Sequence, residues 1–331
     1  MSKEKPKVAF YWCASCGGCE EAVVDLAEEV LKVIELVDIV FWPVAVDTKR
    51  EDIEKMADGE IFASFINGAI RLSEQEDMVK LLRRKSKFII AYGSCSYMGG
   101  IPALANMWNR ETIFNWVYSE SPTVMNPDKT TPKTKIEVKE GELELPLFYN
   151  TVRTLDQVIE VDYYVPGCPP TPQVTKNALL ALLSDELPPK GSVIGALSKS
   201  VCEECPLNET KPDKVLIDSF KRLAVTKIDP EKCLLLQGIP CLGPVTRGGC
   251  GALCPNGKMP CTGCFGPLDG VLDYGGKAIS FLASILDVPP EEDAVLKAIE
   301  NLPDPVGLVY KYSLARSLLR GRIIKKGGGS E

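Results

Sequence analysis

The chain of 331 residues contains no histidine. This absence excludes mixed Cys/His zinc sites, Rieske centres and the usual acid–base group of catalysis at neutral pH. No apolar run is long enough to span a bilayer, so we expect no transmembrane helix. The first residues lack a twin-arginine pair and a long apolar signal segment, which predicts a cytoplasmic protein. The formal net charge of −7 argues against a general affinity for nucleic acid.

Cysteine is abundant instead, with thirteen residues. Twelve of them sort by position into three groups of four, and four thiolates are the common ligand set of an iron–sulfur cluster. The predicted groups are Cys16, Cys19, Cys95 and Cys168; Cys202, Cys205, Cys233 and Cys241; and Cys250, Cys254, Cys261 and Cys264. In a reducing cytosol we interpret such cysteines as metal ligands, not as disulfides. Cys13 is left over, and we interpret it as a structural thiol or one that supports a ligand.

The first half alternates short apolar runs with helical patterns. The runs of strand length are residues 7–12, 39–46, 61–66, 88–92 and 161–165. Apolar residues at three- and four-residue spacing predict helices over 20–36 and 73–84, with Ser73 as the N-cap of the second. This alternation predicts an α/β fold with a doubly wound parallel sheet.

The first group of cysteines falls at the carboxyl ends of these predicted strands. Cys16 and Cys19 follow the first strand, Cys95 follows the fourth and Cys168 follows the fifth. Ligands of open α/β sheets bind at this edge, so we expect the four side chains to converge. Between the first two, Gly17–Gly18 would let the chain wrap closely around a cluster. The alternative is that Cys95 and Cys168 are ordinary core cysteines.

Residues 201–266 contain the other eight cysteines together with many glycines and prolines. Such a segment cannot form an ordinary hydrophobic core, and bound metal clusters would stabilise its fold instead. Proline follows Cys205 and Cys254 directly, which is typical of ferredoxin-type ligand runs. The alternative is a pair of four-cysteine zinc sites. We favour iron–sulfur because only the outer two cysteine pairs have the C-x2-C spacing of zinc knuckles.

Two segments of the first half have an open interpretation. Residues 119–150 are polar and predict a surface excursion with a hairpin whose turn is Glu140–Gly141, either a solvated loop or a subunit contact. Residues 102–117 suit one helix, in which Trp108 and Trp116 are interpreted as core or interface anchors.

The end of the chain predicts two further helices. Residues 271–286 and 291–302 have helical patterns, and we expect them to pack back on the sheet. The tail, residues 316–331, is basic and then rich in glycine, and its end is expected to fray.

The cysteine motifs together resemble the small subunit of a [NiFe] hydrogenase. The likeness is nearest to cytoplasmic group 3 enzymes, namely the methyl-viologen-reducing hydrogenase and the sulfhydrogenase delta subunit. The motifs that carry it are CASCGGCEE at 13–21, GSCSYMGG at 93–100, PGCPP at 166–170, CEECP at 202–206, PCLGPVTRGGCGALCP at 240–255 and PCTGC at 260–264.

This resemblance implies a domain organisation and a route for electrons. Residues 1–190 would form a flavodoxin-like domain with a proximal [4Fe-4S] cluster, and residues 191–331 a smaller domain with two more. The cluster of Cys250–Cys264 would be medial and that of Cys202–Cys241 distal. Hydrogen would react at a NiFe centre in a separate large subunit, so this chain carries no catalytic residue. Electrons would leave through a further iron–sulfur or flavin subunit, such as a heterodisulfide reductase module.

Some features set the chain apart from its implied relatives. Many periplasmic relatives have histidine where this chain has Cys202, and the long insert around Pro122–Glu144 is not general among the relatives. The small subunit of respiratory complex I is the nearest alternative electron carrier. It usually has adjacent cysteines at the first ligand pair and lacks the eight-cysteine region, so both features count against it here.

Overall fold

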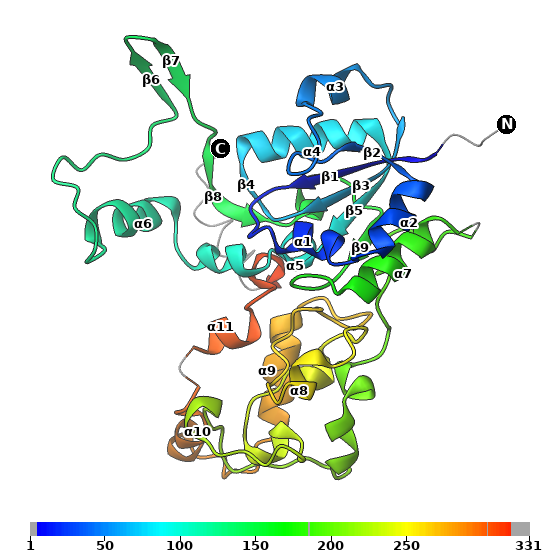
Figure 1. Ribbon diagram of the computed structural model, residues 1–331. Coiled ribbons are helices and arrows are strands. Elements are labelled where there is room, and N and C mark those ends of the chain that lie inside the picture. The colour runs from blue at the N-terminus through cyan, green and yellow to red at the C-terminus, as the bar shows by residue number, and fades with distance from the viewer. Residues whose placement is uncertain (1–4, 185, 303, 319–331) are drawn as a thin grey trace.

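The computed structural model describes residues 5–184, 186–302 and 304–318, and a five-stranded parallel sheet lies at its centre (Figure 1). The strands are β1 (Lys7–Trp12), β2 (Asp38–Phe41), β3 (Ile61–Asn67), β5 (Ser86–Tyr92) and β9 (Tyr163–Val165). Their order, β2-β1-β3-β5-β9, is the flavodoxin-like order. The prediction of a doubly wound parallel sheet is confirmed.

Helices cover both faces of this sheet because its strands are apolar on both sides. On one face lie α1 (Gly18–Val24), α2 (Glu29–Leu36) and α7 (Pro172–Leu182), and on the other lie α3 (Arg50–Lys55) and α4 (Ser73–Lys85). Successive side chains of β1 point to opposite faces of the sheet. Val8 and Phe10 pack with α1 and α7, whereas Ala9 packs with α3 and α4.

Three predicted details of this region are wrong. The second strand ends at Phe41, because the chain turns at once and the Ala45 amide donates to Trp42 O over 2.8 Å. The single helix over 20–36 is two helices, since Ala27 adopts a left-handed conformation (φ 51°) between them. Ser73 is the first residue of α4 and not its cap, and its hydroxyl accepts a hydrogen bond from the Leu147 amide.

The segment between β5 and β9 contains more structure than predicted. After α5 (Ser94–Met98), the expected helix over 102–117 is three pieces: a 3-10 helix η1 (Ile101–Met107), α6 (Arg110–Asn115) and a π-helical turn η2 (Trp116–Glu120). Trp108 and Trp116 are 52% and 55% exposed, so neither is a core residue of this chain.

The polar excursion returns to the body of the protein through a strand that the sequence did not predict. The expected hairpin is present as β6 (Lys135–Val138) and β7 (Gly141–Glu144), but its turn is Lys139–Glu140, one residue earlier than predicted. Next come β8 (Phe148–Arg153), which pairs with β4 (Ile70–Leu72), and η3 (Leu155–Gln157).

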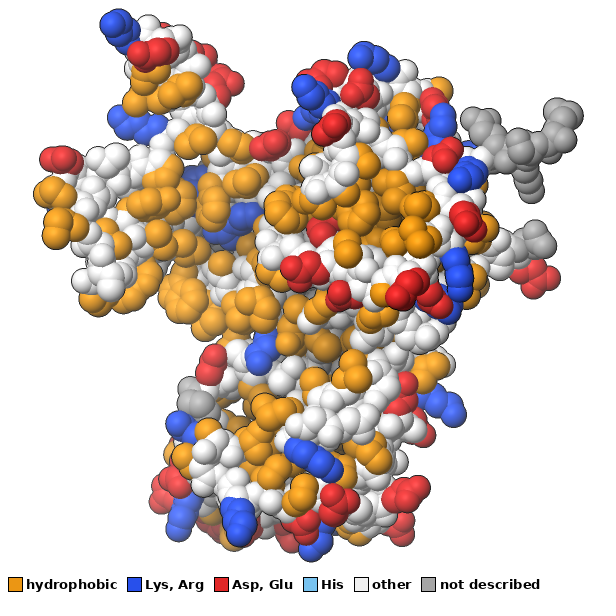
Figure 2. All heavy atoms as spheres, viewed as in Figure 1, with side chains coloured by type: hydrophobic (Ala, Val, Ile, Leu, Met, Phe, Trp, Pro, Cys, Tyr) orange, Lys and Arg blue, Asp and Glu red, His pale blue; other side chains and the backbone are white. Residues whose placement is uncertain are grey.

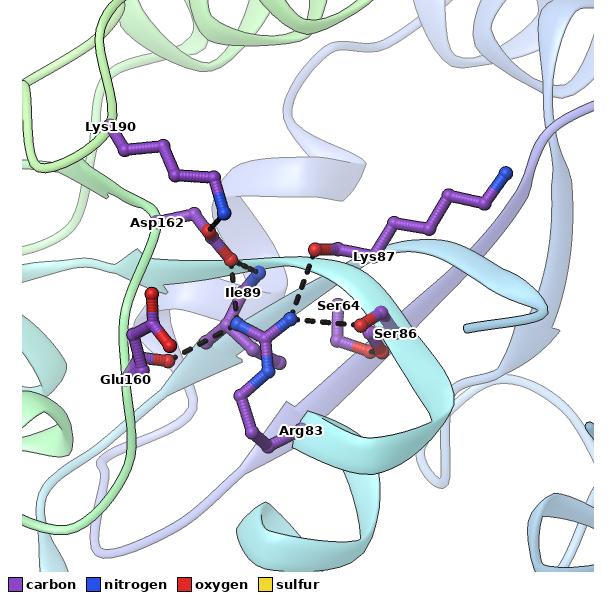
Figure 3. A network of polar contacts seen from close by, with 8 residues as sticks. All are labelled: Ser64, Arg83, Ser86, Lys87, Ile89, Glu160, Asp162 and Lys190. Atoms are coloured by element: carbon purple, nitrogen blue, oxygen red, sulfur yellow. Dashed lines mark hydrogen bonds and ion pairs between the residues drawn. The ribbon is translucent and has the colours of Figure 1, made fainter. Parts of the chain in front are cut away.

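A buried aspartate ties the last strand to the sheet (Figure 3). Asp162 has a fully buried side chain that pairs with Arg83 and with Lys190, each over 2.6 Å. It also accepts the Ile89 amide of β5 over 2.8 Å. Burial alone would raise the pKa of this carboxyl, but the two cations and the amide hold it below its ordinary value. One side chain thus links α4, β5, β9 and the loop after α7.

The chain after α7 forms a second body below the sheet, built mostly from short turns (Figure 1). Its 3-10 segments are η4 (Val201–Glu204), η5 (Pro206–Thr210), η6 (Leu223–Val225), η7 (Leu234–Gln237) and η8 (Gly243–Val245). The last one, η9 (Leu314–Arg316), instead lies against the first body, where the Ala315 carbonyl accepts a hydrogen bond from Gln157 Nε2 over 2.9 Å. Its helices are α8 (Leu253–Asn256), α9 (Tyr274–Ser284), α10 (Glu292–Ile299) and α11 (Pro305–Val309).

The late helices pack inside this second body and not on the sheet, contrary to prediction. On α9, Ala278 and Leu282 are buried in a cluster with Ile217 and Phe220, where loops meet the helix. The predicted fraying of the tail concerns residues that mostly lie outside the described ones. No helix among the described residues is long and apolar enough to cross a membrane.

Candidate metal centres

The first four cysteines meet at the carboxyl edge of the sheet. Cys16 and Cys19 follow β1, Cys95 lies in α5 directly after β5, and Cys168 follows β9. Burial raises the pKa of the Cys19 thiol, and the neighbouring Cys95, Cys168 and Cys16 raise it further, in that order. The structure therefore brings this predicted quartet together from three strand ends.

Two glycines make room for these thiols. A Cβ added to Gly93 would lie 2.4 Å from Cys19 Sγ, and one added to Gly100 would lie 2.3 Å from Cys95 Sγ. Both glycines have positive φ angles, 87° and 57°, which side chains rarely adopt. The Ser94 amide donates to Gly167 O over 2.7 Å, so the two loops are also held against each other. The result is a cradle that only glycine permits at these two positions.

The second quartet lines one pocket of the lower body. The pocket is lined by thiols, prolines and apolar side chains together with two polar residues, Asn208 and Lys211. The other lining residues are Val201, Cys202, Cys205, Leu207, Cys233, Leu234, Leu235, Cys241, Gly243, Pro244 and Pro255. Burial raises the pKa of Cys202, whereas the Lys211 ammonium, which donates a hydrogen bond to its sulfur, lowers it. Lys211 was not predicted from the sequence, although its place six residues after the second cysteine of CEEC was a signal.

The third quartet is also brought together. Burial raises the pKa of Cys264 to about 12, with contributions from the nearby Cys250 and Cys254. Cys264 likewise contributes to the raised pKa of Cys261. The Glu204 carboxylate accepts the Gly249 amide over 2.7 Å and so anchors the loop before Cys250. This role for an acidic residue of the CEECP motif was not predicted.

The third quartet touches both of the others. On one side, the backbone N–H of Cys168 donates to Cys264 Sγ, and the Ser94 hydroxyl donates to the Cys264 carbonyl. On the other side, the Cys261 amide donates to Cys241 Sγ over 3.2 Å. The three quartets therefore form a row, with the group of residues 250–264 in the middle.

The thiols suit a bound cation better than they suit the metal-free chain. Burial raises the pKa of Cys95 to about 12 and that of Cys241 to about 11, so both are neutral thiols at pH 7 without metal. Iron would supply the positive charge that stabilises buried thiolates, and its binding would release protons. Among the described residues, no group of three or more Cys, Asp or Glu side chains is arranged to hold a metal ion. By their chemistry, sets of four cysteine thiols fit iron–sulfur clusters, which are held by thiolates.

Two buried residues are close in sequence to the ligands of the first quartet. Cys13 directly follows β1, its amide donates to Asn67 O over 2.8 Å, and burial raises the pKa of its thiol. Glu20, directly after Cys19, accepts hydrogen bonds from Trp42 Nε1 and from Asn67 Nδ2. Burial raises the pKa of Glu20, and these two donors oppose the rise. No role for Glu20 was predicted from the sequence.

A flavodoxin-like sheet with four cysteines at its strand ends, followed by a loop-rich body with eight more, defines the small-subunit class of [NiFe] hydrogenases. The family described as "NADH ubiquinone oxidoreductase, 20 Kd subunit" matches residues 16–182. The chain is 41% identical over 322 residues to the iron-sulfur subunit of the F420-non-reducing hydrogenase of Archaeoglobus profundus, covering 96% of this chain and 99% of that one. The chain belongs to this family of hydrogenase small subunits.

More distant proteins agree with this assignment. The sulfhydrogenase 2 subunit delta of Pyrococcus furiosus is 25% identical over 261 residues, which cover 79% of this chain and 86% of that one. A chain of the reduced, active Ni-Fe-Se hydrogenase of Desulfomicrobium baculatum shares the fold, with a TM-score of 0.52, 17% identity, and coverage of 81% of this chain and 96% of that one. The predicted resemblance to [NiFe] hydrogenase small subunits is confirmed.

Proposed function

We propose that this subunit relays electrons from hydrogen oxidation in a partner large subunit through three [4Fe-4S] clusters. The observation that carries the proposal is the row of cysteine quartets, joined by the contact of Cys168 with Cys264 and that of Cys261 with Cys241. Iron–sulfur clusters supply one-electron chemistry when bound. The chain's own residues hold the ligands, limit water by burial and set the order of the sites.

The twelve predicted ligands have distinct places in this proposal. The proximal set is Cys16, Cys19, Cys95 and Cys168; the medial set is Cys250, Cys254, Cys261 and Cys264; the distal set is Cys202, Cys205, Cys233 and Cys241. Three of the distal cysteines are only half-buried, which suits transfer to another protein. We propose that this acceptor is a cytoplasmic iron–sulfur or flavin subunit, such as a heterodisulfide reductase module.

Metal analysis of the complex tests the cluster proposal. The chain, purified without oxygen together with its large subunit, should contain about twelve iron atoms and absorb near 400 nm, as expected for three four-iron clusters. The large subunit should contain nickel. Two or more zinc atoms per chain in place of iron would refute the relay and support the zinc alternative.

The order of the relay is tested separately. Cys241→Ser should leave hydrogen-dependent reduction of the proximal cluster intact but slow reduction of an external acceptor. Cys95→Ser should impair both, because it affects the first site. Equal behaviour of the two variants would contradict the proposed order.

A further inference from the structure

Arg71, on the short strand β4, is a buried cation without a counter-ion among the residues that the structure describes. The residue is 5% exposed, and its three side-chain nitrogens have no hydrogen-bond partner in the part of the chain that the structure describes. A guanidinium carries five N–H donors, and buried charges in proteins are normally paired because their desolvation is costly. Within residues 5–184, 186–302 and 304–318, the site therefore lacks an acceptor.

The surroundings of Arg71 make this lack more pronounced. Its guanidinium carbon lies 4.2 Å from the centroid of the Phe148 ring, so an aromatic face covers one side. Burial lowers the pKa of Arg71 to about 10, with a further contribution from the positive charge of Arg110. On the following helix, Glu76 already accepts from Arg153 and from Lys80. The described part of the chain thus brings cations and a ring to this place, and no free carboxylate.

The site adjoins an exposed apolar surface. Phe148 also contacts Phe114 of α6, with ring centroids 5.3 Å apart, so a continuous path of side chains joins Arg71 to that helix. The large exposed side chains on and around this helix, here called the α6 surface, are Ile101, Met107, Trp108, Trp116 and Val117. Figure 2 shows hydrophobic side chains gathered over this lobe, with basic side chains in the hollow between it and the sheet. Tryptophan, methionine and arginine are the residues enriched in protein–protein interfaces.

We propose that Arg71 receives a carboxylate of the hydrogenase large subunit, and that the α6 surface is the apolar part of the same interface. This inference rests on the proposed pairing with a large subunit. The arginine fork can donate two parallel hydrogen bonds to a carboxylate, which supplies both the missing charge and the missing acceptors. The partner carboxylate would enter a site that the chain has already desolvated.

The substitution Arg71→Met separates an interface role from a structural one. In the free chain, the variant should be at least as resistant to urea as the wild type, because an unpaired buried charge has been removed. In the complex, retention of the large subunit on the tagged chain should fall at least tenfold, and it should depend less on salt. The iron content of the chain should not change. The control is Arg84→Met, on the exposed face of α4, which should alter none of these quantities.

Several outcomes would overturn the inference. One is unchanged retention of the large subunit by Arg71→Met, and another is a less stable free chain, which would make Arg71 a structural residue. Stabilisation of the free wild type by phosphate or acetate, lost in the variant while large-subunit binding is unchanged, would assign the site to a small anion. If the wild type retains no large subunit, the proposed function fails as well. These results are distinguishable because the wild type and the variant are measured side by side.

Discussion

The glycine cradle at the first quartet gives the sharpest prediction. In Gly93→Ala the new Cβ would lie 2.4 Å from Cys19 Sγ, whereas ordinary contacts begin at about 3.5 Å. The sulfur or the loop must therefore move by about 1 Å, which far exceeds the ~0.2 Å tolerance of a metal ligand. The backbone at Gly93 (φ 87°, ψ 163°) adds roughly 1–3 kcal/mol of strain for alanine. We expect loss of the proximal cluster together with lower stability.

Gly59→Ala is the matched control. Gly59 also has a positive φ, 73°, but nothing lies within 4 Å of an added Cβ. Its substitution should cost only the backbone strain, about 1–2 kcal/mol, and should leave the iron content unchanged.

The assay is iron per chain and absorbance near 400 nm after anaerobic purification, followed by urea unfolding. Gly93→Ala should lose about four of twelve iron atoms, the content of one cube. Full iron content, with a loss of stability no greater than that of Gly59→Ala, would refute the placement of a cluster in this cradle.

Three further predictions concern a buried ion pair and two cysteines. Asp162→Asn should destabilise the chain by about 3 kcal/mol at pH 7, because it removes the buried carboxylate that pairs with Arg83 and Lys190. Asp58→Asn is the control: Asp58 is exposed in its pair with Lys85, and its substitution should cost less than about 1 kcal/mol. Burial opposes the charge of Asp162, but its cations hold the pKa of the carboxyl below its ordinary value. Its contribution to the free energy of unfolding is therefore present above the unfolded pKa of about 3.9 and is lost as the pH falls through the folded pKa. Urea unfolding in which Asp162→Asn differs from the wild type equally at pH 7 and pH 2 would contradict this. Cys13→Ala should keep all iron and cost about 1 kcal/mol, and loss of iron would instead make Cys13 a ligand. Cys202→His should raise the potential of one cluster in a redox titration, because a thiolate charge is removed, and an equal or lower potential would count against Cys202 as a ligand.

Local patterns in the sequence were enough to predict the central sheet. All five strands were expected at nearly the observed places, because each is a short apolar run between helical patterns. The errors occurred where backbone conformation, and not the hydrophobic pattern, determines where a helix or strand ends. Ala27 splits a helix whose apolar spacing is continuous, and the turn after Phe41 cuts short a run that stays apolar to Val46.

Long-range packing explains what the sequence could not predict. The strand β8 forms because β4 offers it an edge, and α9 packs on loops of its own body and not on the sheet. Such pairings join residues far apart in the chain, and no local period encodes them. For the same reason, only the structure shows that Arg71 has Phe148 and Arg110 near it and no counter-ion from the described residues.

The sequence by itself determined the inventory: thirteen cysteines, no histidine, and motifs that identify the hydrogenase small-subunit family. Ligand type and spacing are chemical facts that need no fold. Only the tertiary structure determined which side chains lie next to one another. It brought four cysteines to one sheet edge and put the 250–264 quartet between the other two. It also enclosed a cation to which the described part of the chain offers no hydrogen-bond acceptor. Proximity across the chain is a property of packing, and it sets which sites can exchange electrons and where a partner can bind.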